Sequence, residues 1–371
     1  MANTNFGSLQ VQEQVAWSRD LWRQARDTSF ATKFMGKGSN AMIQRISTLT
    51  KNSMGTQAVI TLLADLTGDG IAGDNTLEGR EEALNTYEQK IQIDQLRLAS
   101  RNTGRMDDQK TIINFRRDAR DVLGYAFGDR VDQLMMHSLA SIPHTMKLNG
   151  ETRTDNAFAN LSFSGDVRAP TANRVFRWDE ANGLEAGDVL IAPTNTNLVA
   201  ADTPSYKMMV ELKAKAKVQR VRGIRVGGGE EVYHMFISPQ GMARLKLDGD
   251  YLSNIRHAGV RGKRNELFAG SNSVLVDGVW VHETPYAFQN EGASTKWGGG
   301  NVAGQRIVFA GAQALGMADI GHPSWIEESY DYGNQKGISV GKIFGFKKPQ
   351  FLSNMTGQVE DFGCILVDTA I

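Results

Sequence analysis

A stretch of glycines and acids between two segments of strand character constrains this fold more than any other feature. It runs from Leu66 to Glu82 and reads LTGDGIAGDNTLEGREE. Thr56 to Leu66, before it, is rich in Val, Ile, Thr and Leu, and Tyr87 to Leu98, after it, alternates with strand period. A connection of about twenty residues is far longer than an ordinary hairpin loop. Such an excursion has no stable shape alone in water, so we expect it to lie on a neighbouring subunit.

The same stretch partly matches a dinucleotide-binding loop. Three glycines satisfy the pattern G-x-G-x-x-G: Gly68, Gly70 and Gly73. A β-rich run precedes them, and Asp94 follows at about the spacing of the fingerprint. A pyrophosphate site needs backbone amides at the positive end of a helix, and this loop instead carries acids that would repel phosphate. The segment after Gly73 is also a poor helix start.

A calcium loop is the second alternative. Four residues resemble positions one, three, five and six of an EF-hand: Asp65, Thr67, Asp69 and Gly70. The twelfth position should be a bidentate Glu but is Thr76, and the flanks have strand rather than helix character. A looser cation site remains open, built from Asp69, Asp74 and Glu78. The remaining interpretation is a soluble, flexible turn.

Charge and composition exclude several classes of protein. The 371 residues contain 41 Lys plus Arg and 41 Asp plus Glu, so the chain as a whole has no electrostatic preference for nucleic acid or membrane. The single cysteine, Cys364, excludes an internal disulfide framework and is expected in a buried strand. No run of residues is apolar enough to span a membrane, and no secretory signal is visible, so we expect folding in a cytoplasm.

The first 51 residues resemble an arm. Gln10 to Asp27 has helical spacing, and its two tryptophans, Trp17 and Trp22, need a partner surface. Phe34 follows in a stretch of irregular chain. We expect all three aromatic residues to make the contacts of the arm.

The strongest helical pattern runs from Met106 to about Ser141. Apolar residues recur there at intervals of three and four, and Pro143 follows the end. A helix of this length would span roughly 50 Å and serve as a structural spine. Two glycines within it, Gly124 and Gly128, would allow another backbone to approach closely.

The second half of the chain alternates strands and helices. Residues 145–204 are expected to form loops and short strands, and one interpretation is that they are an insertion. Residues 204–219 are expected to form a helix. Residues 231–288 have the pattern strand, helix, strand, with Pro239 in the first helical turn and a hairpin at Asp277-Gly278. Residues 339–348 and 363–367 are expected as closing strands.

No catalytic constellation emerges from the sequence. Gly337 to Gly341 matches G-x-S-x-G, but no histidine follows the serine, so a strand explains the segment better. The six histidines lack metal-ligand spacing. We therefore expect no catalytic residue, no cofactor and no metal beyond the weak cation candidate.

Two basic clusters are candidate contact surfaces. The first comprises Lys207, Lys213, Lys215, Lys217, Arg220, Arg222 and Arg225, and the second Arg256, Arg261, Lys263 and Arg264. Glu211 is the only acid within the first cluster along the sequence. Either cluster could contact an acidic patch on a neighbour, the phosphates of packaged nucleic acid, or only water.

The order of these parts resembles the major capsid proteins of tailed bacteriophages, which share the Hong Kong 97 fold, and in particular the phage N4-like group. In the first half the resemblance rests on Phe34-Met-Gly36, Leu66-Thr-Gly-Asp-Gly70, Gly73-Asp74, Leu77-Glu-Gly79, Ile93-Asp-Gln-Leu-Arg97 and Gly104-Arg-Met106. In the second half it rests on His234, Ser238-Pro239, Gly278-Val279, His282-Glu283, Gly311-Ala-Gln-Ala-Leu315, Asp331-Tyr-Gly333 and Gly345-Phe-Lys-Lys348.

The resemblance implies an α+β shell protein with five parts. Residues 1–51 would be an N-terminal arm, 52–104 an extension loop lying across the adjacent subunit, 105–204 a peripheral domain with spine helix 106–141, 205–325 an axial domain, and 326–371 strands that return to the peripheral domain. The subunit-interface loop would use Thr67, Gly68, Asp69, Gly70, Gly73, Asp74, Leu77, Glu78, Arg80 and Glu81.

It also implies partners and a place in the cell. Copies would assemble as hexamers and pentamers in the host bacterial cytoplasm into a virion capsid that encloses DNA, which the inner face contacts non-specifically. Portal, scaffolding and decoration proteins are further expected partners, and a membrane is not. An encapsulin-type compartment is the alternative shell, and a calcium- or nucleotide-dependent enzyme using residues 66–82 is the alternative from another class.

Overall fold

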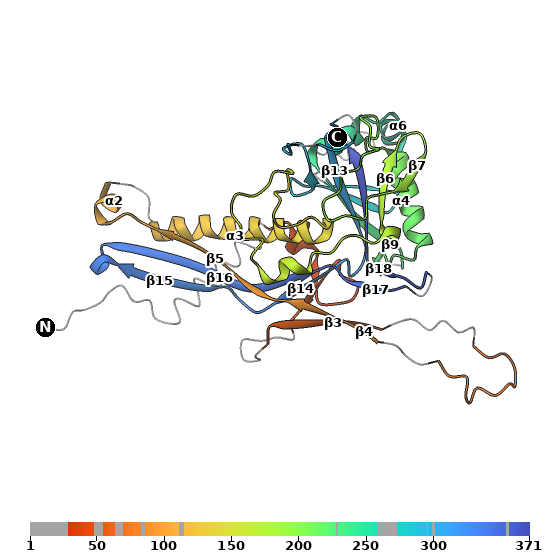
Figure 1. Cartoon of the computed structure of the whole chain (residues 1–371), viewed down its shortest axis with the longest axis horizontal. Helices are drawn as coiled ribbons and strands as arrows, with labels where there is room; N and C mark the ends of the chain where they lie inside the picture. Colours follow the sequence, from red (N-terminus) through yellow and green to blue (C-terminus); the bar gives the residue numbers. More distant parts are fainter. Residues whose placement is uncertain are drawn as a thin grey trace.

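The computed structural model describes residues 29–47, 55–63, 70–82, 86–110, 115–227, 229–258, 273–294, 296–298, 301–353 and 356–371. Two large β-sheets organise this part of the chain (Figure 1). The predicted arm residues Trp17 and Trp22, the loop residues Thr67, Gly68 and Asp69, and the basic residues Arg261, Lys263 and Arg264 lie outside it.

The first sheet is elongated and has six strands, in the order β1-β2-β14-β16-β15, with β5 also paired to β16. Its strands are β1 (Met35–Gly36), β2 (Ile43–Ile46), β5 (Asp94–Arg101), β14 (Leu315–Asp319), β15 (Ser324–Tyr330) and β16 (Gln335–Lys347). The long strand β16 pairs directly with β5, β14 and β15, so this sheet joins the first and last thirds of the chain. The motif Gly337 to Gly341 lies within β16, as expected of a strand.

The second sheet has nine strands, in the order β10-β11-β9-β13-β19-β6-β7, with β8 paired to β9 and β12 to β13. Its strands are β6 (Val175–Asp179), β7 (Gly183–Ala186), β8 (Ile224–Arg225), β9 (Glu231–Ile237), β10 (Ser273–Val276), β11 (Val279–Glu283), β12 (Phe288–Gln289), β13 (Gly304–Ala310) and β19 (Cys364–Ala370). Trp178 of β6 is fully buried, so this part of the possible insertion is integral to the sheet.

Local sequence signals explain the helices that cover this sheet. α4 (Tyr206–Val218) begins after Ser205, whose Oγ accepts from the Met208 amide at 3.3 Å. α5 (Pro239–Leu247) begins at its proline, and α6 (Gly249–Ala258) follows it. The turn between β10 and β11 has positive φ at Asp277 and Gly278, the geometry of a two-residue hairpin. The predicted helices and hairpin are confirmed here.

The predicted long hairpin is present, but its second strand is divided between two sheets. β3 (Gln57–Leu63) pairs with β4 (Thr86–Gln92) in a two-stranded antiparallel sheet. After Ile93 the chain leaves this sheet, and β5 pairs with β16 from the Asp94–Phe344 position onward. The alternating segment from Tyr87 to Leu98 therefore forms parts of two strands rather than one, because β4 pairs with β3 and β5 pairs with β16.

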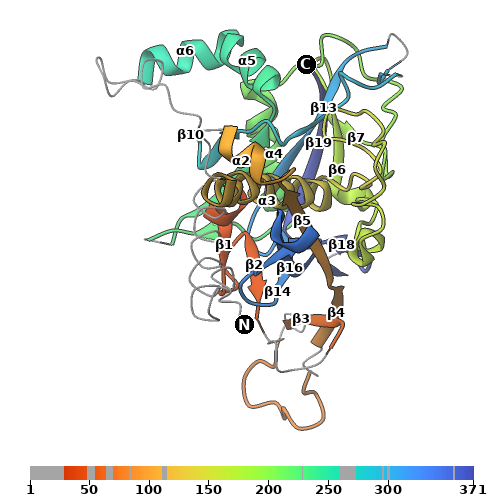
Figure 2. The same ribbon diagram turned by 90° about the vertical axis from the view of Figure 1, so that its left-hand side faces the viewer.

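The spine helix is shorter than the sequence suggested. α2 (Arg105–Lys110) and α3 (Phe115–Ala140) are separate elements, and residues 111–114 between them lie outside the described part. The 26 residues of α3 span about 39 Å. Figure 2, which looks roughly along α3, shows it between the two sheets, and it contacts strands of both.

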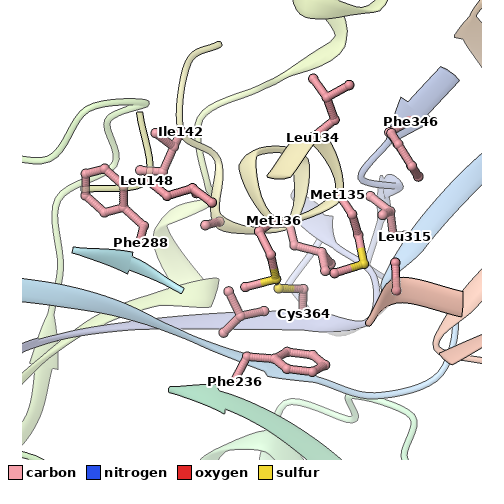
Figure 3. Close-up of a cluster of buried hydrophobic side chains, with 14 of the residues drawn as sticks. Leu134, Met135, Met136, Ile142, Leu148, Phe236, Phe288, Leu315, Phe346 and Cys364 are labelled. Atoms are coloured by element: carbon pink, nitrogen blue, oxygen red, sulfur yellow. The ribbon is translucent and has the colours of Figure 1, made fainter. Parts of the chain in front are cut away.

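One continuous apolar core joins α3 to both sheets. Met135 and Met136 of α3 are fully buried with Phe236 from β9 and Leu315 from β14 (Figure 3). Cys364, at the start of β19, lies in the same cluster, and its burial raises the pKa of the thiol to about 12. The prediction of a buried strand cysteine is confirmed.

Short elements complete the fold. They are η1 (Ala31–Phe34), η2 (Ser162–Asp166), η3 (Ala172–Arg174), η4 (Asp331–Gly333), β17 (Gln350–Leu352) and β18 (Val359–Asp361). Across the described ranges, none of the helices combines the length and apolar character that crossing a membrane requires.

Candidate functional site

The loop between β3 and β4 projects from the body of the molecule. Residues 70–82 are exposed except for the half-buried Ile71, and Figure 1 shows them at one end, beyond both sheets. Leu77 is 60% exposed, although an apolar side chain of this size gains from burial. This is the geometry expected of a segment whose partner surface belongs to another molecule.

Local hydrogen bonds form two turns within the loop. Asn75 Nδ2 donates to the Ala72 carbonyl oxygen at 2.8 Å, and the Arg80 amide donates to that of Leu77 at 3.0 Å. Three glycines adopt positive φ: Gly70, Gly73 and Gly79. Space is open where a Cβ would stand on each of them, so they serve backbone conformation and not close approach to a ligand.

The geometry disfavours a nucleotide site. Residues 70–82 contain no helix, so no helix N-terminus follows Gly73. Asp94 lies in β5, where its carboxylate accepts hydrogen bonds from the amide and hydroxyl of Ser162 at 2.7 and 2.9 Å. The acid that matched the fingerprint therefore holds η2 to β5.

The geometry also disfavours an EF-hand calcium site, because the elements that flank the loop, β3 and β4, are strands and not helices. Asp74 and Glu78 are exposed, and Asp69, the third candidate ligand, lies outside the described residues. Within the described ranges, no three His, Cys, Asp or Glu side chains come close enough to hold a metal ion.

Two members of the first basic cluster form ion pairs that the sequence did not indicate. Lys213 Nζ lies 2.8 Å from Asp277 Oδ1 and so ties α4 to the β10–β11 turn. Arg225 lies 4.0 Å from Glu231. The sequence identified only Glu211 as an opposing charge, because the two acids are contributed by other elements of the sheet.

Four other members of this cluster form an exposed basic surface at the end of α4 and in the turn after it. The members are Lys215, Lys217, Arg220 and Arg222. The Lys215 ammonium lies 5.4 Å from the centroid of the Phe176 ring, and the Arg222 guanidinium 5.9 Å from that of Phe362. These cations are therefore positioned by aromatic rings while remaining accessible.

Phe34, one of the three residues predicted to make the contacts of the arm, packs within its own chain. Its ring packs edge-on against Phe236, with 5.2 Å between centroids, and also contacts His234 and His282. Asp132 of α3 anchors the same segment, and no sequence signal pointed to it. An acid on a helix gives no local sign that a distant segment will use it.

Comparisons with known proteins agree along the whole chain. The sequence profile of the family described as phage capsid protein matches residues 5–371. The chain is 48% identical over 372 residues to the major capsid protein of Pseudomonas phage KPP25, covering 99% of this chain and 97% of that protein.

Two solved structures share the fold. The capsid of Ralstonia phage GP4 superimposes with a TM-score of 0.74 at 24% identity, covering 92% of this chain and 91% of that one. The capsid of cyanophage Pam1 gives 0.70 at 18% identity, covering 100% and 96%. At these identities the two likenesses concern the fold alone.

Proposed function

This chain belongs to the family of phage capsid proteins, and from that premise we propose how its copies meet in the shell. It is the major capsid protein of a tailed bacteriophage, a structural subunit of the icosahedral capsid and not an enzyme, and it has the Hong Kong 97 fold. Its copies associate with one another, and we propose that they do so as hexamers and pentamers. Closed shells need contacts between different surfaces of neighbouring copies.

The division into domains follows the two sheets. The six-stranded sheet with α3 is the peripheral domain, and the nine-stranded sheet with α4, α5 and α6 is the axial domain. This proposed division differs from the sequence-based boundaries. β1, β2, β5 and β14 go with the peripheral domain, and β6, β7 and β19 with the axial domain, because each pairs with strands of that sheet.

The loop 70–82 is the extension loop that lies across the adjacent subunit. The observation that carries this assignment is its nearly complete exposure at the end of a two-stranded hairpin. Only the base of this hairpin is packed within the subunit, where Ile60 and Ile91 are buried with Phe351. Contact with a neighbour would bury Leu77 and fix the loop in one conformation.

Charge complementarity supports a proposal for the partner surface. The loop carries four acids and one base: Asp74, Glu78, Glu81, Glu82 and Arg80. The exposed basic surface on α4 and the following turn is the complementary candidate on the adjacent copy.

A charge exchange tests this contact. The double variant Glu78→Lys/Glu81→Lys should block assembly, and adding Lys215→Glu/Lys217→Glu should restore shells. Electron microscopy of Glu78→Lys/Glu81→Lys, of Lys215→Glu/Lys217→Glu and of the variant that combines all four changes shows which of them form shells. Failure of rescue, with both double variants folded, would assign the basic surface to another partner.

The remaining partners are proposed from the family and from charge. Portal, scaffolding and decoration proteins would meet the assembled shell. Packaged DNA would contact basic side chains of the inner face without sequence preference. The second basic cluster is a candidate for that contact. The phage N4-like group is the finer family proposed, supported by the ordered motifs in the sequence.

The other two hypotheses have less support. An encapsulin-type compartment shares the shell-forming role, but the matching profile and the curated relative are both phage proteins. For an enzyme acting through residues 66–82, the described part of that segment, residues 70–82, contains no helix of the kind that a nucleotide loop requires. Calorimetry with calcium or a dinucleotide should accordingly show no saturable binding to the subunit.

Negative-stain electron microscopy of the purified protein tests the shell-forming function. The expected result is closed particles of uniform diameter, from the protein expressed alone or together with the other head proteins of the phage. Only unassembled subunits under both conditions would contradict it.

A further inference from the structure

The first described residues of the chain are held over a pair of histidines. Residues 29–36, which include η1 and β1, form what we term the N-terminal latch. Phe34 places its ring 5.1 Å from that of His234 and 5.0 Å from that of His282, centroid to centroid. Phe30 packs edge-on against Phe236 at 5.6 Å. The rings of Phe30 and Phe34 therefore rest on the face of the larger sheet formed by β9 and β11, while β1 pairs with β2 of the six-stranded sheet.

The two histidines are bonded directly to each other. His234 Nδ1 lies 2.8 Å from His282 Nε2, and the residues belong to adjacent parallel strands. One nitrogen must donate and the other accept, so this bond is incompatible with a proton on both atoms. Trp280 stacks on the far side of His282, with 6.5 Å between ring centroids. Aromatic rings thus cover part of the pair, and both imidazoles are half-buried, so two positive charges there would be incompletely solvated.

The protein environment keeps both imidazoles neutral near pH 7. Burial lowers the pKa of His234 to about 4. Burial, the neighbouring His234 and Lys33 lower that of His282 to about 4 as well. Lys33 belongs to η1, so the latch itself contributes a positive charge that disfavours protonation.

A second, polar anchor holds the same segment. Asp132 of α3 is buried, and its carboxylate accepts hydrogen bonds from Ser29 Oγ at 2.7 Å, the Phe30 amide at 2.7 Å and the Ala31 amide at 2.9 Å. Burial raises the pKa of this carboxyl. Asp132 is therefore a second titratable group that acts on the latch, and a test must separate it from the histidines.

We propose that the His234–His282 pair is an acid-operated release for the N-terminal latch. Protonation of both imidazoles breaks their mutual hydrogen bond and places two positive charges beside Lys33 and under the rings of Phe30 and Phe34. The latch then leaves β9 and β11 while the sheet stays folded. This release is a property of the single chain and does not depend on how copies assemble.

Hydrogen–deuterium exchange of peptides covering residues 29–36, measured on the full-chain subunit, tests the release. Protection is compared at pH 7 and pH 4.5 after correction for the intrinsic exchange rate. Since each histidine prefers a proton in the released state, the opening equilibrium should rise by at least about tenfold over this interval. Peptides from β13 and β19 should keep their protection.

Three variants decide the cause. His234→Gln/His282→Gln should abolish the pH dependence of exchange in residues 29–36, and the matched control His322→Gln, at an exposed histidine, should retain it. Lys33→Gln should weaken the response at pH 4.5, because it removes a charge that disfavours protonation of His282 in the closed latch. Persistence of the response in the double variant would assign it to Asp132 and overturn the proposal, as would unchanged protection of the native chain at pH 4.5.

Discussion

At the residue scale, one buried ion pair joins the end of α3 to the larger sheet. Arg306 Nε and Nη2 donate to the two carboxylate oxygens of Asp368 at 2.7 and 2.8 Å, and Nη1 donates to the Ala140 carbonyl oxygen at 3.2 Å. Both charged side chains are fully buried. Asn195 Nδ2 donates to the same carboxylate at 2.9 Å, so both oxygens of Asp368 accept charge-assisted hydrogen bonds.

Asp368→Asn should lower the free energy of unfolding by about 3–5 kcal/mol, because the Arg306 guanidinium would remain buried without its counter-charge. Urea denaturation of the unassembled subunit measures this. Arg306→Met/Asp368→Leu should cost less than the single change, since no charge is left unpaired. Glu151→Gln, which breaks the exposed Lys147–Glu151 pair, is the surface control and should leave the midpoint unchanged. Equal effects of Asp368→Asn and Glu151→Gln would contradict the account.

A buried histidine near the end of α3 predicts acid sensitivity. Burial and, to a smaller extent, the nearby Arg153 charge lower the pKa of His144 to about 4. The unfolded chain binds this proton near pH 6.5, whereas the folded chain does not, so stability is lost as pH falls from about 6.5 towards 4. The loss from this group should reach about 2 kcal/mol at pH 5. His144→Gln should reduce the stability difference between pH 7 and pH 5 by that amount, and parallel pH curves would contradict it.

At the element scale, local signals were sufficient where the chain makes its own contacts. Ser205, Ser238-Pro239 and Asp277-Gly278 specify helix starts and a turn through bonds to residues within a few positions. The membership of strands in sheets was not predictable in this way. β5 and β19 have the apolar pattern of strands, but their partners lie far along the chain and are chosen by packing. Asp132 and the two histidines were missed for the same reason.

Packing at the centre of α3 predicts an effect of added volume. Gly124 is buried, whereas Val122, two residues earlier, is 66% exposed. Gly124→Leu should destabilise the subunit by about 1–3 kcal/mol, because the larger side chain overpacks a filled interior. Val122→Leu is the matched control and should change stability by less than about 0.5 kcal/mol. Unchanged unfolding of Gly124→Leu would show that the surroundings can absorb the added side chain.

Removal of the extension loop should separate folding from assembly. Deletion of Thr67–Glu81 should leave a soluble subunit with nearly unchanged thermal unfolding, since the described residues of this loop are almost all exposed. Shell formation should be lost. A Gly–Ser segment of the same length tests whether the residues or only the reach of the loop matter. Normal particles from the deletion variant would refute the extension-loop assignment.

At the scale of the whole molecule, one core joins the six-stranded and the nine-stranded sheet, while residues 70–82 lie almost fully exposed. The equal numbers of acidic and basic residues suit close packing of many copies, because no net charge opposes it. Complementary charges are instead separated on the surface, acids on the loop and bases around the end of α4. The single subunit is therefore folded but incomplete at this surface.

A cryo-electron microscopy reconstruction of the assembled capsid tests this claim most directly. We predict that residues 70–82 of each subunit lie on the adjacent subunit, with Leu77 buried and the acids of the loop facing basic side chains. A closed shell in which this loop packs on its own subunit, or extends freely into solvent, would contradict the account.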